Sequence, residues 1–374
     1  MAASKDLKVM VIVPYKIFPA IAGGQKCAKS MYNYLAALMP VTIVSVNSNE
    51  KVDAKFDVLN ILNTGKFRYI NILLFFTLKK IIKEKKITHL FIEHPYLGWL
   101  GYLLKKFCKV KFVVRSQNIE GERFKTMGKP WWKILLGYEK WVHKNADVSL
   151  FITEEDLNYG LTNFKLEKQK SFVATYGIGI QDKPSVEKRA EAKAIICAKH
   201  KIETSEKLLL FNGSLDYYPN VEALSEIFNK VNPILLEKNF NYKIIICGKN
   251  LPEKFNELIK QKNIVFAGFV EDINQYFLAC DIFINPVIDG GGIKTKLVEA
   301  LGFNLNAVSY QSGGIGVPER ITNKKMVILN NGDVEAFTNK IISTDTTIDI
   351  QKEFYNHFYW GNIAANIKDI LSSN

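Results

Sequence analysis

Three consecutive glycines, Gly290–Gly292, stand directly before a helical pattern that carries Lys294, Lys296 and Glu299. A glycine run before a helix presents backbone N–H groups that can bind a phosphate or the sugar hydroxyls beside it. Positive charge is unfavourable at the start of a helix, so we interpret the two lysines as facing an anion. Glu299 lies about one helical turn further on, where its carboxylate could accept hydrogen bonds from ribose hydroxyls. The alternative interpretation is that Glu299 is an ordinary solvent-exposed helix residue. The group predicts a site for a phosphorylated, sugar-containing ligand.

Glycines follow three other apolar runs, as Gly23-Gly24, Gly213-Ser214 and Gly248-Lys249. Glycine allows the backbone to come close to a ligand, and a helix start offers unpaired N–H groups to an anion. For Gly23-Gly24, a tight turn without a ligand is the alternative. The spacing is not Gly-x-Gly-x-x-Gly, and the second strand-like run ends in Ser45-Val-Asn-Ser48 without an acidic residue. Both observations argue against a dinucleotide cofactor.

Polar side chains also end two strand-like runs of the first half. His94 follows one of them and either contacts an acceptor or caps the turn, while Arg115 and Asn118 end the next and should face the same cleft. A glycoside hydrolase would need two carboxylates at a defined separation. The strand-end carboxylates give no convincing pair: Glu93, Glu120, Asp216 and Asp289. The chain has no Asp-x-Asp metal motif, which is consistent with metal-independent chemistry.

These groups need a scaffold of strands and helices in alternation. Short, continuous apolar runs, typical of parallel strands covered on both faces, are expected at 8–13, 41–46, 88–92, 110–114, 148–152, 208–211, 243–247, 264–267, 282–285, 305–309 and 326–329. Helical patterns lie at 25–38, 67–85, 97–107, 131–144, 154–161, 221–236, 252–260, 272–278, 294–301, 334–342 and 354–371.

Two successive β-α series predict an α/β protein with two doubly wound, Rossmann-like domains that face each other across a cleft. The Gly- and Pro-containing stretch 176–184 is the expected seam. We therefore predict a first domain over 1–178, a second over 179–353, and a last helix over 354–374 that crosses back to the first.

Several segments together resemble one family, the GT-B glycosyltransferases of glycosyltransferase family 4. In the second half they are NGSLDYYPNVEAL, IIICGKN, IVFAGFVEDINQYFLACDIFINPV and GGGIKTKLVEALGFNLNAVSYQSGG, which cover about residues 207–320 in the family's order. In the first half they are AGGQKCAKSMYNYLAAL, VVRSQNIEGERF and YEKWVHKNADVSLFITEEDL. The resemblance spans nearly the whole chain and implies the GT-B fold, with the nucleotide-sugar in the second domain and the acceptor in the first.

The resemblance also implies roles for individual residues. Glu299 matches the second glutamate of the family's Glu-x7-Glu motif, which acts on the donor ribose, whereas Gly291 stands in place of the first. The family's Arg and Lys after the first strand of this domain are missing, so Lys294 or Lys296 is the best cation for the diphosphate. The histidine often found in the first domain appears as Gln117-Asn118.

The expected site residues fall into three groups. The catalytic group is Lys294, Glu299 and Asn118. The donor-binding group is Gly213, Ser214, Gly248, Lys249, Val270, Gly290, Gly291, Gly292, Lys294, Lys296 and Glu299. The acceptor-side group is Gly23, Gly24, His94 and Arg115. The nucleotide-sugar is the donor substrate, and no cofactor or metal is expected.

Charge is distributed unequally between the two halves of the 374-residue chain. Residues 1–150 hold 25 basic and 10 acidic side chains, a net charge of +15. Residues 151–374 have a net charge of −2, which gives +13 for the whole chain. Lys66–Lys86 and Lys129–Lys144 combine basic with aromatic residues, which suits either an anionic bilayer or an ordinary solvated helix face. Nucleic acid is not expected, because no recognised nucleic-acid-binding motif occurs.

The cysteines and the hydropathy bear on localisation. Five scattered cysteines without Cys-x-x-Cys spacing are typical of a reducing compartment. No signal peptide and no uninterrupted apolar run of membrane-spanning length is seen. We expect a cytoplasmic protein, peripheral on the inner face of the membrane.

The sequence thus predicts a metal-independent glycosyltransferase that moves a sugar from a nucleotide-sugar to a saccharide or lipid-linked acceptor in cell-envelope polysaccharide synthesis. The resemblance implies retention of anomeric configuration. The alternative is a non-catalytic nucleotide- or sugar-binding scaffold on the same fold, and an NAD-dependent enzyme ranks below both.

Overall fold

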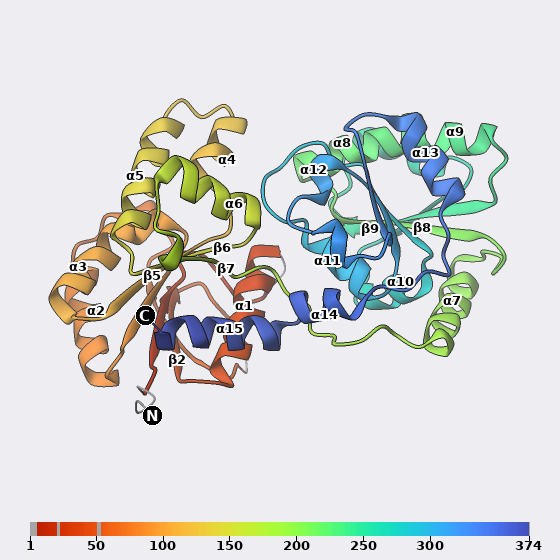
Figure 1. Ribbon diagram of the computed structural model, residues 1–374. Helices are drawn as coiled ribbons and strands as arrows, with labels where there is room; N and C mark the ends of the chain where they lie inside the picture. Colours follow the sequence, from red (N-terminus) through yellow and green to blue (C-terminus); the bar gives the residue numbers. More distant parts are fainter. Residues whose placement is uncertain (1–5, 21–22, 51–53, 374) are drawn as a thin grey trace. The chain divides into compact units, whose positions relative to one another are not determined.

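The computed structural model describes residues 6–20, 23–50 and 54–373, and these form two compact units. Unit 1 runs to Gly177 and resumes at Phe358, whereas unit 2 comprises Ile178–His357. Each unit has a parallel sheet with helices on both faces (Figure 1). No helix within the described part of the chain is both long and apolar enough to cross a bilayer.

Unit 1 contains a seven-stranded sheet in the order β3-β2-β1-β4-β5-β6-β7. The strands are β1 (Val9–Ile12), β2 (Val41–Val46), β3 (Asp57–Leu62), β4 (His89–Glu93), β5 (Lys111–Ser116), β6 (Val148–Phe151) and β7 (Ser171–Val173). The helices are α1 (Gly23–Ala36), α2 (Leu73–Lys85), α3 (Gly98–Cys108), α4 (Glu120–Thr126), α5 (Trp132–Asn145), α6 (Glu154–Tyr159) and α15 (Trp360–Ser373).

The two faces of the unit 1 sheet have different helical layers. Met10 and Ile12 of β1 pack in one cluster with Leu78 of α2, Leu104 of α3 and Val142 of α5. Side chains alternate between the faces of a strand, so the neighbouring residues of β1 point to the opposite face. Helices α1 and α15 pack against each other in this unit (Figure 1).

Unit 2 contains a six-stranded sheet in the order β10-β9-β8-β11-β12-β13. The strands are β8 (Lys207–Ser214), β9 (Tyr242–Lys249), β10 (Ile264–Gly268), β11 (Ile282–Asn285), β12 (Asn306–Tyr310) and β13 (Met326–Leu329). The helices are α7 (Val186–His200), α8 (Tyr218–Glu226), α9 (Asn232–Glu237), α10 (Ile273–Ala279), α11 (Thr295–Gly302), α12 (Gln311–Gly314), α13 (Val334–Ser343) and α14 (Lys352–Phe358), the last ending at the first residue of the resumed unit 1.

In both sheets the strand order reverses at one point. This point lies between β1 and β4 in unit 1 and between β8 and β11 in unit 2. Ligands of doubly wound sheets bind beyond the carboxyl ends of the strands at such a reversal. The loops that follow these four strands are therefore where a ligand is expected.

Several predicted elements differ from the observed ones. The helix predicted over 252–260 is two 3₁₀ turns, Glu253–Phe255 and Leu258–Lys260. The helix predicted from 67 begins at Leu73, after a 3₁₀ turn at Lys66–Tyr69. The helix predicted over 221–236 contains a π-helical turn, Ile227–Val231, directly before Asn232-Pro233, where proline has no N–H for an α-helical bond.

Candidate functional site

Two loops meet at the carboxyl edge of the unit 2 sheet. Strands β8 and β11 are parallel neighbours, so the loops that follow them leave the sheet side by side. A Cβ atom on Gly290 would lie 3.3 Å from Cγ of Pro219 and 3.5 Å from the hydroxyl of Tyr217. Gly290 also has a φ of 96°, which favours glycine. The glycine-rich loop thus packs against the tyrosine-bearing loop.

Lys294 is the N-cap of α11, one residue before the helix, rather than part of its first turn as predicted. Its extended conformation turns the side chain back over the glycine loop. The Nζ atom donates to the carbonyl oxygens of Gly290 at 2.6 Å, Gly292 at 3.1 Å and Gly291 at 3.4 Å. Burial lowers the pKa of Lys294 to about 8.

Lys296 projects from α11 into the loop that follows β8. Its Nζ donates to the carbonyl oxygen of Asn212 at 3.2 Å and to Oδ1 of Asn220 at 3.0 Å, and lies 4.3 Å from the centre of the Phe211 ring. Burial, and then the charge of Lys294, lower the pKa of Lys296 to about 7. Lys296 therefore places a cation in the loop where the Arg and Lys implied by the resemblance are missing.

Neither lysine forms an ion pair with any carboxylate among the described residues. Their ammonium groups are held by oxygens of neutral amides alone. Burial without a counter-charge disfavours the charged form of both lysines, and a bound anion would restore it. This arrangement favours a bound anion at the glycine loop.

The remaining donor-side residues predicted from sequence lie around the same edge. Strands β8 and β9 pair Gly213 with Gly248 and Ser214 with Lys249. A Cβ on Gly248 would come within 2.1 Å of the Gly213 carbonyl oxygen, so the two strand ends need glycine to approach. Val270 follows β10, the neighbour of β9, and Glu299 is half-buried on α11.

A buried ion pair lies at the carboxyl edge of the unit 1 sheet. Glu93 of β4 and Arg115 of β5 are paired across the two strands, and both side chains are fully buried. The Nη1 atom of Arg115 donates to both carboxylate oxygens of Glu93, at 3.1 and 3.2 Å. Tyr32 of α1 donates to the same carboxylate, and Nη2 of Arg115 lies 3.2 Å from the sulfur of Cys27. Arg115, predicted to face an acceptor, instead points into the core and holds α1 to the sheet.

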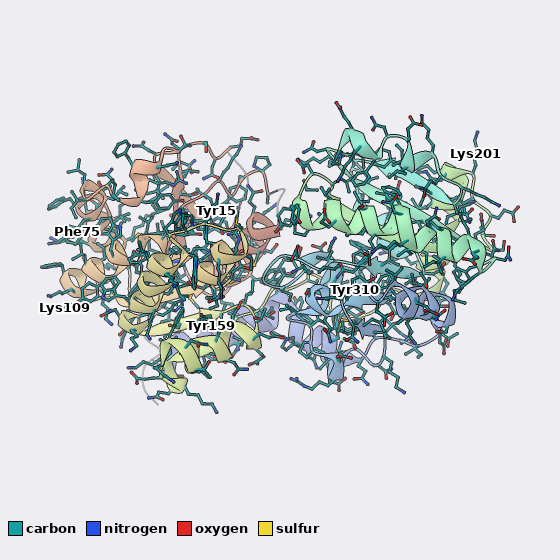
Figure 2. All side chains as sticks on the ribbon, turned by 90° about the horizontal axis from the view of Figure 1, so that it is seen from above. Tyr15, Phe75, Lys109, Tyr159, Lys201 and Tyr310 are labelled. Atoms are coloured by element: carbon teal, nitrogen blue, oxygen red, sulfur yellow. The ribbon has the colours of Figure 1, made fainter. Side chains whose placement is uncertain are left out.

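Gln117 connects this ion pair with the glycine start of α1. Its Nε2 donates to Oε2 of Glu93 and to the hydroxyl of Tyr15, each at 3.1 Å. A Cβ on Gly24 would lie 3.0 Å from Oε1 of Gln117, so a glycine allows the helix start to approach. Gly23 is the first residue of α1, and the predicted loop residues 21–22 before it lie outside the described part. Figure 2 labels Tyr15, which follows β1.

His94 has the most unusual backbone of this edge. Its φ of 60° and ψ of 153° fall in a region that is almost reserved for glycine, which costs on the order of 1–3 kcal/mol for other residues. The imidazole lies between the rings of Tyr15 and Tyr96, with centroid distances of 5.8 and 5.7 Å. Its Nδ1 is 3.1 Å from Oε1 of Glu120, although this contact is not well enough aligned to count as a hydrogen bond.

Glu120, the first residue of α4, is completely buried and receives several donors. They are the Tyr96 hydroxyl at 2.5 Å, Nη1 of Arg123 at 3.0 Å and Nδ2 of Asn118 at 3.4 Å. Burial opposes ionisation, but His94, Arg123 and Tyr96 outweigh it and lower the pKa of Glu120 to about 2. The predicted catalytic residue Asn118 thus lies beside a permanently ionised carboxylate.

A second carboxylate, Glu139 of α5, holds the start of α4. Its oxygens accept the backbone N–H groups of Glu120 at 3.1 Å and Gly121 at 3.0 Å. Burial raises the pKa of Glu139 to about 8. Sequence reasoning missed both α4 and the roles of Glu120 and Glu139. The sequence did contain one signal for α4, because acidic residues are favoured in the first turn of a helix and Glu120 and Glu122 lie there.

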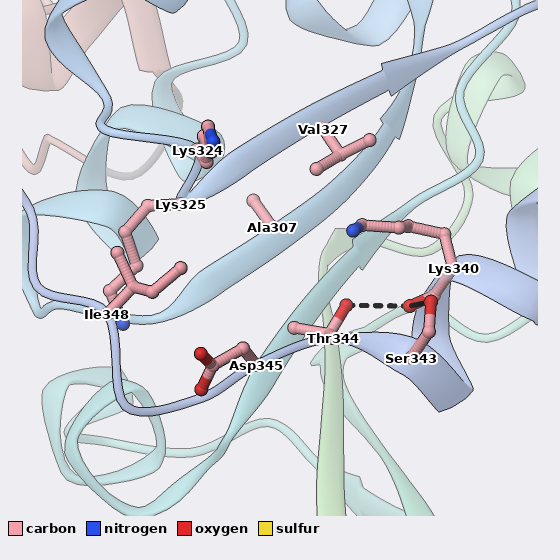
Figure 3. Close-up of a pocket in the computed structure, with 9 residues that line it drawn as sticks. All are labelled: Ala307, Lys324, Lys325, Val327, Lys340, Ser343, Thr344, Asp345 and Ile348. Carbon is pink, nitrogen blue, oxygen red and sulfur yellow. Dashed lines mark hydrogen bonds between the residues drawn. The ribbon is translucent and has the colours of Figure 1, made fainter.

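Unit 2 also has a small cavity that contains none of the predicted site residues (Figure 3). It lies at the amino ends of β12 and β13, opposite the glycine loop, and is lined by Ala307, Lys324, Lys325, Val327, Lys340, Ser343, Thr344, Asp345 and Ile348. Lys325 is buried and donates to the carbonyl oxygen of Asn304 at 2.8 Å. Three lysines and one carboxylate, Asp345, line this cavity, but it lies at the amino ends of the strands, whereas ligands of doubly wound sheets bind at the carboxyl ends.

Comparison with known proteins agrees with this geometry. Residues 206–344 match the model of the family described as Glycosyl transferases group 1. An uncharacterized 44.6 kDa protein in the cps region of Klebsiella pneumoniae is 27% identical over 175 residues, which are 44% of this chain and 44% of that protein. The match therefore spans less than half the length of this relative.

Solved structures show the fold. The sucrose-phosphate synthase of Thermosynechococcus elongatus has a TM-score of 0.72 at 17% identity, with 98% of each chain covered. Anabaena Alr3699/HepE in complex with UDP-glucose has a TM-score of 0.68 at 12% identity. The match covers 98% of this chain and 100% of that one. The two doubly wound α/β domains of the GT-B fold, predicted from sequence, are confirmed.

Proposed function

Since residues 206–344 match the model of the glycosyl transferases of group 1, we propose that this chain belongs to that family and transfers a sugar from a nucleotide-sugar donor to a saccharide or lipid-linked acceptor. The observation that carries the proposal is the pair of half-buried lysines, Lys294 and Lys296, beside Gly290–Gly292 without a carboxylate partner in the described chain. The relative in the cps region supports a role in cell-envelope polysaccharide synthesis.

In this proposal the donor is bound at the carboxyl edge of the unit 2 sheet. The diphosphate exchanges with the glycine carbonyls as the partner of the Lys294 ammonium, and Lys296 supplies a second positive charge through the loop after β8. Glu299 accepts hydrogen bonds from the ribose, and Gly213, Ser214, Gly248, Lys249 and Val270 surround the rest of the nucleotide. Fixed positive charge at the departing diphosphate stabilises the transition state without requiring a metal.

The proposed donor site is tested by calorimetry with UDP, ADP and GDP and by transfer assays with the matching nucleotide-sugars. UDP is the first choice, since the Anabaena neighbour was crystallised with UDP-glucose. Lys294→Ala and Glu299→Ala should each abolish most turnover while the protein remains folded. Lys262→Ala, on an exposed lysine of the same unit, is the control. Full activity in both site variants would contradict the donor assignment.

The anomeric outcome is part of the proposal. We expect retention, as implied by the family resemblance, and NMR of the product's anomeric proton distinguishes it from inversion. A non-catalytic scaffold is the second candidate, motivated by Gly291 in place of a glutamate and by Ser214 in the loop after β8. Tight nucleotide binding without hydrolysis or transfer to any acceptor would favour the scaffold.

We place the acceptor at an anionic membrane surface, because unit 1 exposes apolar side chains beside basic ones. Phe67, Ile70 and Phe76 are 78%, 71% and 65% exposed. Further exposed apolar residues are Ile72, Leu73 and Phe107, and nearby basic residues are Lys66, Lys79, Lys80, Lys83, Lys106 and Lys109. Phe75 and Lys109 lie at the outer edge of this unit in Figure 2. Apolar residues flanked by lysines suit the interface of a bilayer with anionic lipid.

Vesicle flotation tests the membrane proposal. The protein should bind vesicles that contain phosphatidylglycerol, bind phosphatidylcholine vesicles weakly, and lose binding at high salt. The double variant Phe67→Ser/Phe76→Ser should reduce binding, whereas Ile195→Ser, an exposed apolar residue on α7 of unit 2, should not. If all variants bound both kinds of vesicle equally, the proposal that the acceptor lies at an anionic membrane surface would be contradicted. The protein would act at the inner face of the membrane.

A further inference from the structure

His94 lies at the point of unit 1 where a doubly wound sheet binds ligands. It follows β4, and Tyr15 follows β1, the two strands between which the strand order reverses. The His94 side chain is 12% exposed, so its ring is largely enclosed but reaches the surface. An imidazole in this place can contact a ligand that arrives at the carboxyl edge of the sheet.

We propose that His94, oriented by Glu120, accepts a hydrogen bond from a hydroxyl group of the acceptor saccharide and so positions that hydroxyl for transfer. The inference rests on the proposed glycosyltransferase function and names the side chains that recognise the acceptor. Glu120 does not touch the acceptor and acts as a positioning residue.

The contacts of Glu120 determine which nitrogen of His94 is available. The carboxylate is held from three segments by Tyr96, Asn118 and Arg123, so it is fixed in place beside Nδ1 of His94. The contact as it stands is not a hydrogen bond, but an ionised carboxylate 3.1 Å away can only accept, so its proximity favours the neutral tautomer with the proton on Nδ1. Nε2 is then a hydrogen-bond acceptor, and no described residue donates to it. A sugar hydroxyl is a suitable donor.

The aromatic neighbours limit the movement of the imidazole. Tyr96 stacks on the ring with an interplanar angle of 27°, and Tyr15 approaches edge-on at 66°. Tyr15 is itself held by Gln117, which contacts the Glu93 carboxylate. The ring therefore has a fixed plane and a fixed face, which is what positioning of one hydroxyl requires.

The backbone at His94 indicates that the side chain is retained for a reason other than local folding. Glycine adopts its φ and ψ without strain, whereas histidine does not. Strained residues of this kind concentrate at binding and active sites. A glycine at position 94 would keep the turn before Pro95 and remove only the imidazole.

This difference provides the test. His94→Gly relieves the backbone strain, whereas His94→Asn keeps a side chain at the same φ and ψ, and neither residue replaces the imidazole. We expect each to lower kcat/KM for the acceptor about 100-fold, the usual effect of losing one well-placed hydrogen bond in the transition state. The Kd for the nucleotide, measured by calorimetry, should stay within about twofold of the wild-type value, because the nucleotide is bound in unit 2.

Lys201→Gly is the matched control. Lys201 has a φ of 55° at the end of α7 in unit 2 and is labelled in Figure 2. This variant exchanges a positive-φ residue for glycine far from His94 in the sequence, and it should leave transfer unchanged. Full acceptor turnover in both His94→Gly and His94→Asn would overturn the proposal. Failure of the wild-type protein to bind any nucleotide would instead refute the proposed function.

The tautomer of His94 can be measured without turnover. Long-range ¹H–¹⁵N NMR of the histidine-labelled wild-type protein, recorded on the neutral imidazole, should show the proton on Nδ1 and none on Nε2. Glu120→Gln should alter this signal and lower kcat/KM for the acceptor, while the Kd for the nucleotide stays unchanged. A proton on Nε2 in the wild-type protein would overturn the assigned orientation.

Discussion

The affinity for a nucleotide-sugar should fall as the pH rises from 7 to 9. Lys296 and Lys294 have pKa values of about 7 and about 8, both lowered by burial. A bound diphosphate stabilises the protonated ammonium groups and therefore raises both pKa values. Binding then takes up protons, so affinity is greatest below the pKa values of the free protein and is lost as the pH rises through them.

The size of the effect follows from these pKa values. If the diphosphate restores an ordinary lysine pKa, affinity at pH 9 falls by about 100-fold through Lys296 and about 10-fold through Lys294. The combined limit is about 1,000-fold, or roughly 4 kcal/mol, relative to fully protonated lysines. The diphosphate of a nucleotide-sugar has no group that titrates between pH 7 and 9, and the uracil N3–H of UDP-glucose begins to ionise only at the top of this range, so the slope between pH 7 and 8 reports the lysines.

Calorimetry with UDP-glucose at pH 7, 8 and 9, in two buffers of different ionisation enthalpy, measures both the affinity and the proton uptake. Lys296→Met should bind more weakly at pH 7 and lose most of the pH dependence, while Lys262→Met should behave as wild type. Measurable binding with a flat affinity between pH 7 and 9 and no proton uptake would refute the reasoning, because it would place both lysines away from the diphosphate.

Three further predictions concern single residues. Arg115→Met leaves Glu93 buried without its partner and should lower the free energy of unfolding by about 3–5 kcal/mol in urea titration; a loss below 1 kcal/mol would contradict a structural role. The pKa of Glu139 is raised to about 8, so its stabilising contribution is complete below the ordinary glutamate pKa and is lost as the pH rises through 8. Glu139→Gln should therefore flatten the decrease in stability over that range, and an unchanged slope in thermal melts would argue against it. Gly290→Ala, with its Cβ 3.3 Å from Pro219, should weaken nucleotide binding at least tenfold, whereas Gly332→Ala, also at positive φ but with open space, should not.

The grouping of the glycine loop with the two lysines was predictable because its signals are local. Gly290–Gly292, Lys294 and Lys296 are neighbours in sequence, and their spacing before a helix already suggested an anion site. The contacts that they make were not predictable. That Lys296 reaches Asn212 and Asn220 depends on β8 and β11 being neighbours in the sheet, which is a property of strand order.

The first unit shows why a charged residue at a strand end is an ambiguous signal. Arg115 was expected at the acceptor, but Glu93 lies opposite it on β4, and the two neutralise each other in the core. Cross-strand pairing between residues so far apart has no sequence signature. Helix α4 was missed because seven residues are too few for a clear apolar periodicity, and its stability depends on Glu139 from α5.

The edge strands of unit 1, β3 and β7, were missed, whereas β10 and β13 at the edges of the unit 2 sheet were predicted. Strand β3 is the last strand beyond β2, and most of its side chains are exposed or half-buried. Its polar residues Asp57 and Asn60 therefore interrupt the continuous apolar run that marks a central parallel strand. Strands β10 and β13 are also edge strands, but their continuous apolar runs, Ile264–Ala267 and Met326–Leu329, made them recognisable.

The chain returns to unit 1 with α15, and this has a consequence for the order of folding. Helix α15 packs against α1, near the opposite end of the sequence, with Tyr359 5.7 Å from Tyr34 and Trp360 against Gly177. During synthesis, unit 2 has all of its strands before α15 leaves the ribosome, whereas the apolar face of α1 must wait for its partner. A nascent chain stalled before Trp360 would therefore contain a folded second unit and an incompletely covered first one, which is a state that chaperones recognise by its exposed apolar surface.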